Sequence, residues 1–349
     1  MLSDPATPTF RPFSGTLDLV QTWVPEELVA STAWSRLQAA AARLPAALTQ
    51  SFYLECHLAG DVSRTDLILE IGDAGRVILA GENPAIQLER SVSAHPTWEH
   101  LAQLCRQWIH RPNGVCRQVQ RLWLELDLDV EAGRQAVPAP RLFVDWHQPL
   151  PAASARRTLE PFLNAFGALT GAPASEAREA LRYCLDGLTP ETSIYSLGLF
   201  PEHREPALRL CVRGPETRQV EYVRKLERFG ELPCLPLASS EEGQRGRILH
   251  LDASRHGIDR IGFERGLRQL KSPDLLKDTY LDCLVDAGLC SPAKRLALAA
   301  WPGGRVETFP HEIWPSLAAR WVNHVKVTQT ADGAQRAKAY LCHRHVPRL

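Results

Sequence analysis

The sequence predicts an α+β protein: a ten-stranded antiparallel β-barrel with a polar lumen, surrounded by helices. Two observations carry this prediction. Pairs of strand-like segments occur five times along the 349 residues, and segments with helical periodicity flank every pair. Within each strand-like segment one face is apolar and the other is polar or charged, because successive strand residues point to opposite faces. Helices can cover the apolar faces, so the charged faces are free to point inward.

The five strand pairs recur at intervals of roughly 60 to 70 residues, which indicates an internal structural repeat. The pairs cover residues 52–58 with 64–71, 120–129 with 141–146, 193–200 with 207–212, 247–252 with 258–266, and 323–328 with 337–342. A short third strand is expected at 76–79, after an Asp-Ala-Gly turn. The segment 301–321 is expected to be a connection that contains proline and one helix.

The helical segments lie between these pairs. They cover residues 14–47 with an interruption at Pro25, and then 97–109, 154–169, 175–188, 217–229, 275–287 and 292–300. We expect residues 1–50 to form a helical segment that packs on the barrel, and residues 51–349 to form a single barrel domain. An open sheet with one solvated face would show the same alternation and is the alternative. Closure is favoured because it removes two long sheet edges.

The composition excludes several classes of protein. Forty Lys and Arg residues balance forty Asp and Glu residues, so no net field attracts the molecule to nucleic acid or to an anionic membrane. No run approaches 18 apolar residues, and the N-terminus lacks the pattern of a signal peptide. We therefore expect a cytoplasmic protein with neither nucleic acid nor membrane as a partner. Nine scattered cysteines favour neither a disulfide framework nor a zinc ribbon.

Alternation also predicts which polar residues face the lumen. In the last pair, Val325 and Val327 face outward, which leaves His324 and Lys326 inside. The inward residues of the other strands include Tyr53, Glu55, His57, Arg64, Asp66, Glu70, Trp123, Glu125, Asp127, Arg141, Phe143, Asp145, Arg209, Cys211, Arg213, Arg260, Glu264, Lys338 and Tyr340. Four of these cations recur near the start of the second strand of a pair, which predicts a cationic ring: Arg141, Arg209, Arg260 and Lys338.

Familiar catalytic motifs are absent from the sequence. It has no glycine-rich phosphate loop, no G-x-S-x-G elbow, no H-E-x-x-H pair and no aspartate-rich cluster for magnesium. A metal site from His324, Cys342, His343 and His345 is conceivable. Neighbouring strand residues face opposite ways, however, which favours an ordinary C-terminal tail. We expect no metal site and no cofactor.

The repeated order of helices and strand pairs, the polar lumen, and the Lys338-x-Tyr340 motif resemble the ABBA-type aromatic prenyltransferases. These include indole prenyltransferases and, more distantly, cyanobactin peptide prenyltransferases. Glu55 on the first barrel strand and Arg64 on the next also resemble a pair found in the indole enzymes. The resemblance implies a metal-independent enzyme that binds a prenyl diphosphate and an aromatic or peptide acceptor inside the barrel.

The resemblance also implies roles for individual residues. Cations would bind the diphosphate and stabilise its departure, and aromatic faces would hold the allylic cation. Glu55 would orient the acceptor and His57 would remove the final proton, although an ion pair with Arg64 is the alternative role of Glu55. The expected substrate-binding residues are Arg64, Arg209, Arg260, Lys326, Lys338, Tyr340, Trp123 and Tyr53.

The chain departs from the family at the other Lys/Arg-x-Tyr positions. Phe143, Cys211 and Gly262 stand where tyrosines would complete the shield around the allylic cation. Other aromatic residues must then supply the shield, or the ligand differs. The alternative function is therefore a barrel without catalytic activity that binds an anionic ligand or a peptide.

Overall fold

The architecture is given by a computed structural model. It describes residues 10–60, 64–110, 115–128, 137–170, 174–200, 208–226, 229, 248–268, 270–309 and 313–347. The expected strand ends at 129, 207 and 247 lie outside the described residues.

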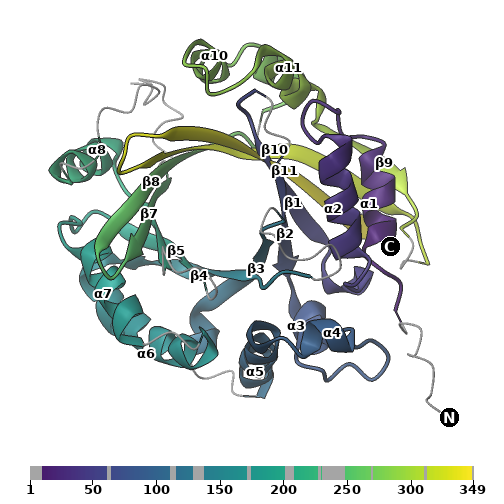
Figure 1. Cartoon of the computed structure of the whole chain (residues 1–349), viewed down its shortest axis with the longest axis horizontal. Helices are drawn as coiled ribbons and strands as arrows, with labels where there is room; N and C mark the ends of the chain where they lie inside the picture. Colours follow the sequence, from purple (N-terminus) through teal and green to yellow (C-terminus); the bar gives the residue numbers. More distant parts are fainter. Residues whose placement is uncertain are drawn as a thin grey trace.

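Ten antiparallel strands close into a barrel, which confirms the predicted fold class (Figure 1). The strands are β1 (Ser51–His57), β2 (Thr65–Ile71), β3 (Val119–Leu126), β4 (Arg141–Pro151), β5 (Ser193–Leu199), β6 (Leu208–Arg213), β7 (Ile248–Ser254), β8 (Gly257–Gly266), β10 (Ser316–Thr330) and β11 (Gln335–Pro347). Each strand pairs with its neighbours in this order, and β11 pairs with both β10 and β1. The β1–β11 pair joins the two ends of the sheet, so the barrel has no open edge.

The helices lie outside the ring of strands (Figure 1). They are α1 (Ser14–Gln21), α2 (Ser31–Ala41), α3 (Asp73–Leu79), α4 (Arg90–Ser93), α5 (Pro96–His110), α6 (Ala152–Thr170), α7 (Ala174–Leu185), α8 (Glu216–Lys225), α9 (Ser272–Leu276), α10 (Thr279–Asp286) and α11 (Pro292–Ala300), with 3-10 turns at Ala46–Leu48 and Val115–Gln118. Within the described part of the chain, none of them combines the length and apolar character needed to cross a lipid bilayer.

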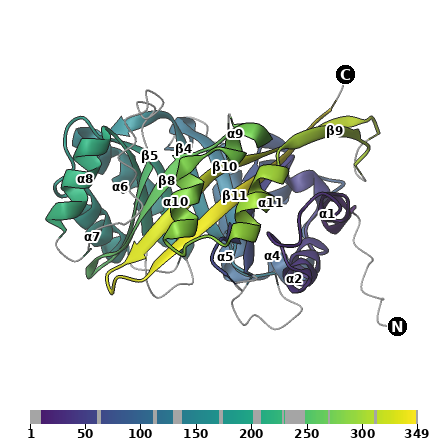
Figure 2. The same cartoon turned by 90° about the horizontal axis from the view of Figure 1, so that it is seen from above.

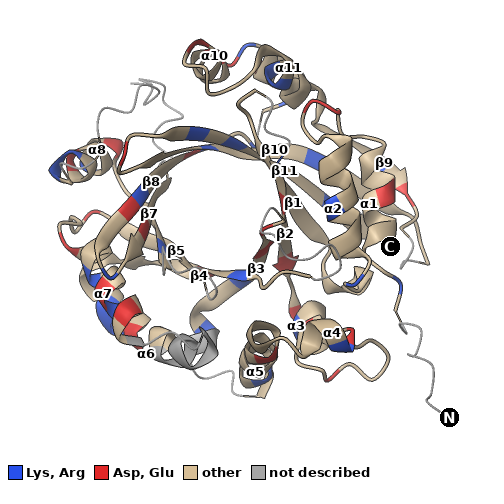
Figure 3. Cartoon of the chain, viewed as in Figure 1, with Lys and Arg blue, Asp and Glu red and all other residues tan. Residues whose placement is uncertain are grey.

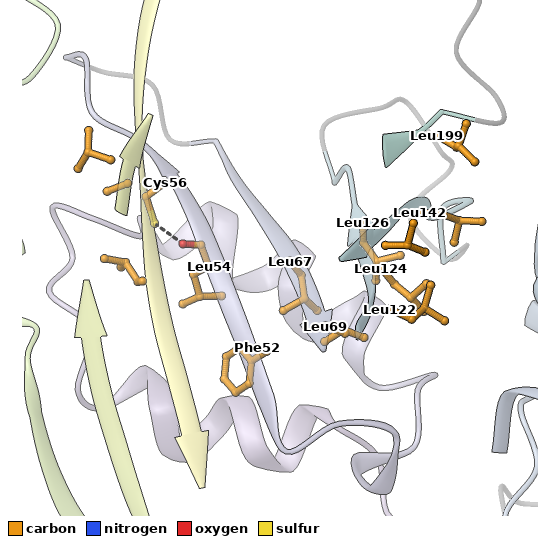
Figure 4. Packing of buried hydrophobic residues seen from close by; sticks show 14 of the residues in the cluster. Phe52, Leu54, Cys56, Leu67, Leu69, Leu122, Leu124, Leu126, Leu142 and Leu199 are labelled. Atoms are coloured by element: carbon orange, nitrogen blue, oxygen red, sulfur yellow. Dashed lines mark hydrogen bonds between the residues drawn. The ribbon is translucent and has the colours of Figure 1, made fainter. Parts of the chain in front are cut away.

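The main hydrophobic core fills the layer between the strands and the helices. Phe52, Leu54 and Cys56 of β1 are fully buried on its outer face, and the leucines of β2, β3 and β4 continue this layer (Figure 4). On the N-terminal side, the ring of Phe13 meets that of Phe52 edge to face at 5.2 Å. The apolar faces are thus covered by helices, which leaves the polar faces to line the interior.

Two local expectations were wrong. Residues 76–79 belong to helix α3 and not to a strand, because Gly75, Ile78 and Leu79 recur at helical spacing on its buried face. Gly75 is required there, since a Cβ atom would lie 2.3 Å from the Leu48 carbonyl oxygen. The segment 301–321 contains strand β9 (Gly303–Glu307) and the first residues of β10, which together project beyond the barrel (Figure 2).

The expectation of an ordinary C-terminal tail was also wrong. Residues 335–347 form strand β11, which pairs with β10 along its whole length. His343 and His345 are buried on its outer face, where the His345 ring stacks on Phe309 at 4.5 Å and the His343 ring lies 4.8 Å from Phe52. Aromatic packing accounts for these two histidines.

Candidate functional site: two ends of the barrel lumen

The polar faces of the strands meet inside the barrel, as the alternation predicts. Glu55 lies opposite both Asp66 and Tyr340, and Glu125 lies opposite Arg141. Both acidic and basic residues occur on the ring of strands (Figure 3). The lumen has two ends of different chemistry. Strands β1, β3, β5 and β7 run from one end of the lumen to the other. The end at which these strands begin is called the cavity end, and the end at which they terminate is called the paired end.

Three groups of ion pairs occupy the paired end. They join Arg64, Asp66, Glu125, Asp127 and Arg141 between β2 and β4, Arg209, Asp252 and Arg260 between β6 and β8, and Glu55, Lys326 and Lys338 between β1, β10 and β11. Every cation in these groups has a carboxylate oxygen within 4.0 Å. Four of the five cations predicted to bind phosphate therefore already have a carboxylate oxygen within 3.7 Å. The fifth, Lys326, has its Nζ atom 4.0 Å from a carboxylate oxygen of Glu55.

The Arg209–Asp252 pair is the buried interaction with two hydrogen bonds. Arg209 donates from Nε and Nη2 to the two carboxylate oxygens of Asp252, at 2.6 and 2.9 Å. The two residues are only 6% and 2% exposed. Burial opposes the ionisation of Asp252, but the charge and hydrogen bonds of Arg209 hold its pKa below the ordinary value. The Phe200 ring lies 5.3 Å from the guanidinium carbons of both Arg141 and Arg209 and links two of the groups.

The two predicted catalytic residues also lie at the paired end. Glu55 is fully buried and accepts a hydrogen bond from Lys338. Burial opposes its ionisation, yet Lys338 and Lys326 hold its pKa well below the ordinary value. Burial and the charge of Lys338 lower the pKa of His57 to about 3, so its imidazole is neutral at pH 7.

A cavity of about 330 Å³ occupies the cavity end, at the lower limit of ordinary small-molecule pockets. Its lining comprises Tyr53, Ile68, Arg121, Trp123, Glu125, Phe143, Asp145, Tyr195, Ser196, Arg209, Cys211, Arg213, Ile248, His250, Glu264, Gly266, Arg268, Asn323, His324, Lys326 and Tyr340. Five Arg or Lys residues and three carboxylates are among them. Gly266 and Arg268 are exposed, so the cavity meets solvent on their side.

Aromatic rings form one wall of this cavity. Trp123, Tyr340 and Ile68 make a small hydrophobic cluster inside the barrel, separate from the main core, and Tyr53 and Phe143 pack against it. The Tyr53 and Trp123 rings are stacked with centroids 5.2 Å apart. These rings present faces that can hold an apolar chain or a cation.

Cations with few carboxylate contacts lie next to this wall. Lys326 Nζ is 4.9 Å from the Tyr340 ring centroid, and burial and the charge of Arg209 lower its pKa to about 8, so it is protonated at pH 7. Arg213 lies 3.9 Å from the Tyr195 ring centroid. Among the described residues, no carboxylate lies within 4.0 Å of Arg213 or Arg268. Anions in this cavity would therefore meet two cations, Arg213 and Arg268, that no described carboxylate contacts within 4.0 Å.

Glu264 on β8 lies against two histidines, and one of them is within hydrogen-bond distance. His250 Nε2 lies 3.0 Å from one of its carboxylate oxygens, and His324 Nδ1 lies 3.5 Å from the other. Cys211 Sγ is 3.5 Å from His250 Nδ1, and the Asn323 side-chain nitrogen is 2.9 Å from His324 Nδ1. These contacts assign the proton of His250 to Nε2, from which it donates to the carboxylate, while Nδ1 accepts from the thiol.

The titration behaviour of this cluster follows from its burial. Burial raises the pKa of Glu264 to about 7, although the charges of Lys326 and Arg213 oppose the shift. Burial and the charge of Lys326 lower the pKa values of His250 and His324 well below the ordinary value. Both imidazoles are therefore neutral near pH 7, and Glu264 is the member of the cluster that changes charge there.

Half of the ten predicted site residues line the cavity, and two of these, Arg209 and Lys326, also belong to the ion-pair groups of the paired end. Tyr53, Trp123, Arg209, Lys326 and Tyr340 line the cavity. The other predicted residues face the lumen at the paired end and are not part of the cavity lining: Glu55, His57, Arg64, Arg260 and Lys338. The substrate roles assigned to them stay predictions.

A group with the spacing of metal ligands also lies at the paired end. One ligand atom each from Glu55, His57 and Asp66 lies within 4.8 Å of the others, the one such cluster among the described residues. Lys338 and Arg64 already bind the two carboxylates. A metal ion would have to displace both cations, so these residues do not fit a metal centre well.

Sequence reasoning overlooked several residues of the cavity. Arg213 and Glu264 were expected to face inward but received no role, and His250 follows from the alternation of Leu249 and Leu251 around it. Arg268 lies just beyond β8, where alternation no longer applies. Proximity between Glu264 and its histidines depends on the pairing of β7, β8 and β10, which the sequence does not encode locally.

Comparison with known proteins yields likenesses to solved structures alone. The chain matches no family model and no curated protein. Among solved structures it resembles the apo form of the prenyltransferase PriB, at 14% sequence identity and a TM-score of 0.47, over 95% of this chain and 93% of that chain. The fold assignment rests on the strand pairings of this chain, which form a closed ten-stranded antiparallel barrel surrounded by helices. This is the ABBA-type architecture that the sequence predicted.

Proposed function

We propose that this protein transfers a prenyl group from an allylic diphosphate to an aromatic small molecule or an aromatic side chain of a peptide. One observation carries the proposal: a single cavity holds five cations, three carboxylates and a wall of aromatic rings. The cations match the charge that develops on a departing diphosphate, and the rings match an allylic cation. The reaction needs both in one enclosed space.

Within this proposal the cavity residues have distinct roles. The departing diphosphate is stabilised by three cations: Lys326, Arg213 and Arg209. Asp252 binds Nε and Nη2 of Arg209, so Arg209 contacts the diphosphate through its other terminal nitrogen. Tyr340, Trp123 and Tyr53 shield the allylic cation from water, in place of the tyrosines that the other strands lack. No step in this scheme requires a protein-bound metal, because the side-chain cations supply the positive charge.

The alternative is a barrel that binds an anionic ligand or a peptide and makes no bond. The ion pairs of the paired end favour it, because they neutralise Arg141, Arg260 and Lys338, which the cationic ring was expected to contribute. A ligand would then meet only the cations of the cavity.

Mass spectrometry distinguishes the two functions. The protein is incubated with prenyl diphosphates of increasing chain length and with a panel of indoles, tyrosine derivatives and aromatic peptides. We expect an acceptor to gain the mass of one prenyl group, with a yield that is unchanged by EDTA. Binding of a diphosphate without any product would support the alternative, and a yield abolished by EDTA and restored by Mg²⁺ would contradict the metal-independent scheme.

A further inference from the structure

Glu264 differs from the carboxylates of the paired end in its partners. Each carboxylate there contacts an Arg or Lys nitrogen within 4.0 Å. Among the described residues, Glu264 has no such contact: it accepts a hydrogen bond from the neutral imidazole of His250, and the neutral imidazole of His324 lies 3.5 Å away. A carboxylate that is not held by a cation keeps its ability to accept a proton. Glu264 also lines the cavity, so a bound acceptor can reach it.

We propose that Glu264 is the general base that takes the proton from the aromatic acceptor, and that His250 is a positioning residue that orients its carboxylate. This inference rests on the proposed prenyl transfer. In that reaction the C–O bond of the allylic diphosphate breaks, and diphosphate leaves with the electron pair. The acceptor ring supplies the pair for the new C–C bond and then loses one proton to Glu264, which restores the aromatic ring.

The surroundings of Glu264 suit this role. Groups that face it come from five other strands: Asp145 of β4, Tyr195 of β5, Cys211 and Arg213 of β6, His250 of β7, and His324 and Lys326 of β10. The charges of Lys326 and Arg213 favour the carboxylate form, while burial and Asp145 oppose it. The resulting pKa of about 7 matches a base that gains and releases a proton near neutral pH.

Asp145 is the cavity carboxylate that most resembles Glu264, yet it is engaged differently. Its Oδ2 accepts a hydrogen bond of 2.9 Å from Trp123 Nε1. Trp123 belongs to the aromatic wall, so Asp145 fixes the orientation of this ring. Glu125, the third carboxylate of the lining, is bound to Arg141 at 2.6 Å. These contacts leave Glu264 as the cavity carboxylate best placed to accept a proton.

The test compares Glu264→Gln with the unmodified protein in three measurements. Urea unfolding reports the fold, calorimetry with a non-ionising allylic thiolodiphosphate reports donor binding, and mass spectrometry reports transfer. We expect normal folding and donor affinity, and a transfer rate that falls by roughly 100-fold to 10,000-fold. We also expect a primary deuterium isotope effect to appear with an acceptor deuterated at the reacting carbon, because proton removal becomes slow.

The pH dependence tests the role of His250. Transfer by the unmodified protein should rise as the pH passes through about 7, because the base acts in its ionised form. His250→Phe removes the donor to the carboxylate, so the rise should move to higher pH, and His250→Gln should restore it in part. A purely structural role would lower the rate without moving the profile.

Two outcomes overturn the inference. If Glu264→Gln transfers the prenyl group at the normal rate while Glu55→Gln, folded by the urea criterion, does not, the base is at the paired end and prenyl transfer itself stands. If the unmodified protein binds the thiolodiphosphate but modifies no acceptor, the proposed function fails and the role of Glu264 fails with it.

Discussion

The two ends of the lumen are built from the same residue types on the same inward faces, but their charges are arranged differently. At the paired end, Arg64, Arg141, Arg260 and Lys338 each bind a carboxylate. At the cavity end, Arg213 and Arg268 have no carboxylate within 4.0 Å among the described residues, and Glu264 has histidines for partners. Charges at the paired end compensate one another, whereas Arg213, Arg268 and Glu264 at the cavity end have no oppositely charged Arg, Lys, Asp or Glu contact among the described residues.

This difference has a physical basis. A buried charge costs several kcal/mol unless a partner compensates for it, and the buried carboxylates Glu55, Asp66 and Asp252 of the paired end each contact a cation. A cavity that opens to solvent can leave some charges without a partner, because water or a ligand compensates for them. Unpaired charge in a protein interior therefore indicates a binding site more reliably than charge alone.

The largest expected effect is on the free energy of unfolding, which should respond differently to substitutions at the two ends. Asp252→Asn leaves Arg209 buried beside Arg260 without a compensating charge, and should lower the free energy of unfolding by about 3 to 5 kcal/mol. Glu264→Gln should leave it unchanged or raise it above pH 7. Burial raises the folded-state pKa of Glu264, so its contribution to stability is present at low pH and is lost as the pH rises through about 7.

Urea unfolding at pH 8 measures both variants. Glu176→Gln, which breaks the exposed pair with Arg255, serves as the control and should have a much smaller effect than Asp252→Asn. Equal losses of stability in Asp252→Asn and Glu264→Gln would remove the distinction between the ends.

The next largest expected effect is on the affinity for a diphosphate ligand, which should depend on the cavity end more than on the paired end. Lys326→Met should weaken binding of an allylic thiolodiphosphate by about 1.5 to 3 kcal/mol, roughly tenfold to a hundredfold in Kd, because one charge-assisted contact is lost. Lys338→Met is the matched control, since Lys338 contacts Glu55 outside the cavity lining. Calorimetry measures both. A larger loss in Lys338→Met would favour the phosphate role that the sequence predicted for it.

The smallest effect concerns the boundary between the ends. Gly198 lies beneath Phe143, and an added Cβ would meet that ring at 2.3 Å. Gly198→Ala should therefore push Phe143 toward the cavity and lower the free energy of unfolding by about 1 to 3 kcal/mol. Gly262→Ala is the control, because its Cβ would meet Thr328 at 3.1 Å and require only a small adjustment. Urea unfolding that ranks the two variants in the opposite order would contradict this packing.

Much of the barrel was predictable from local patterns. Alternation identified Trp123, Arg209 and Lys326 as inward-facing. The apolar residues next to them in the same strands face outward and pack beneath the helices, as expected. The prediction was wrong where a short segment is compatible with both the helical and the strand periodicity, as in α3. It was also wrong where a strand follows a proline-containing segment, as in β9. In such segments a few residues carry too little periodicity to decide between helix and strand.

The side of the sheet to which a residue points was determined by the sequence itself, because a period of two is a property of adjacent residues. The partners of the inward residues were decided only by the closed barrel. Glu55 and Lys338 are 283 positions apart and meet because β1 pairs with β11. Glu264 meets His250 and His324 because β8 lies between β7 and β10. Register and closure set the depth of each side chain in the lumen, and depth separates a structural ion pair from a group that can act on a ligand.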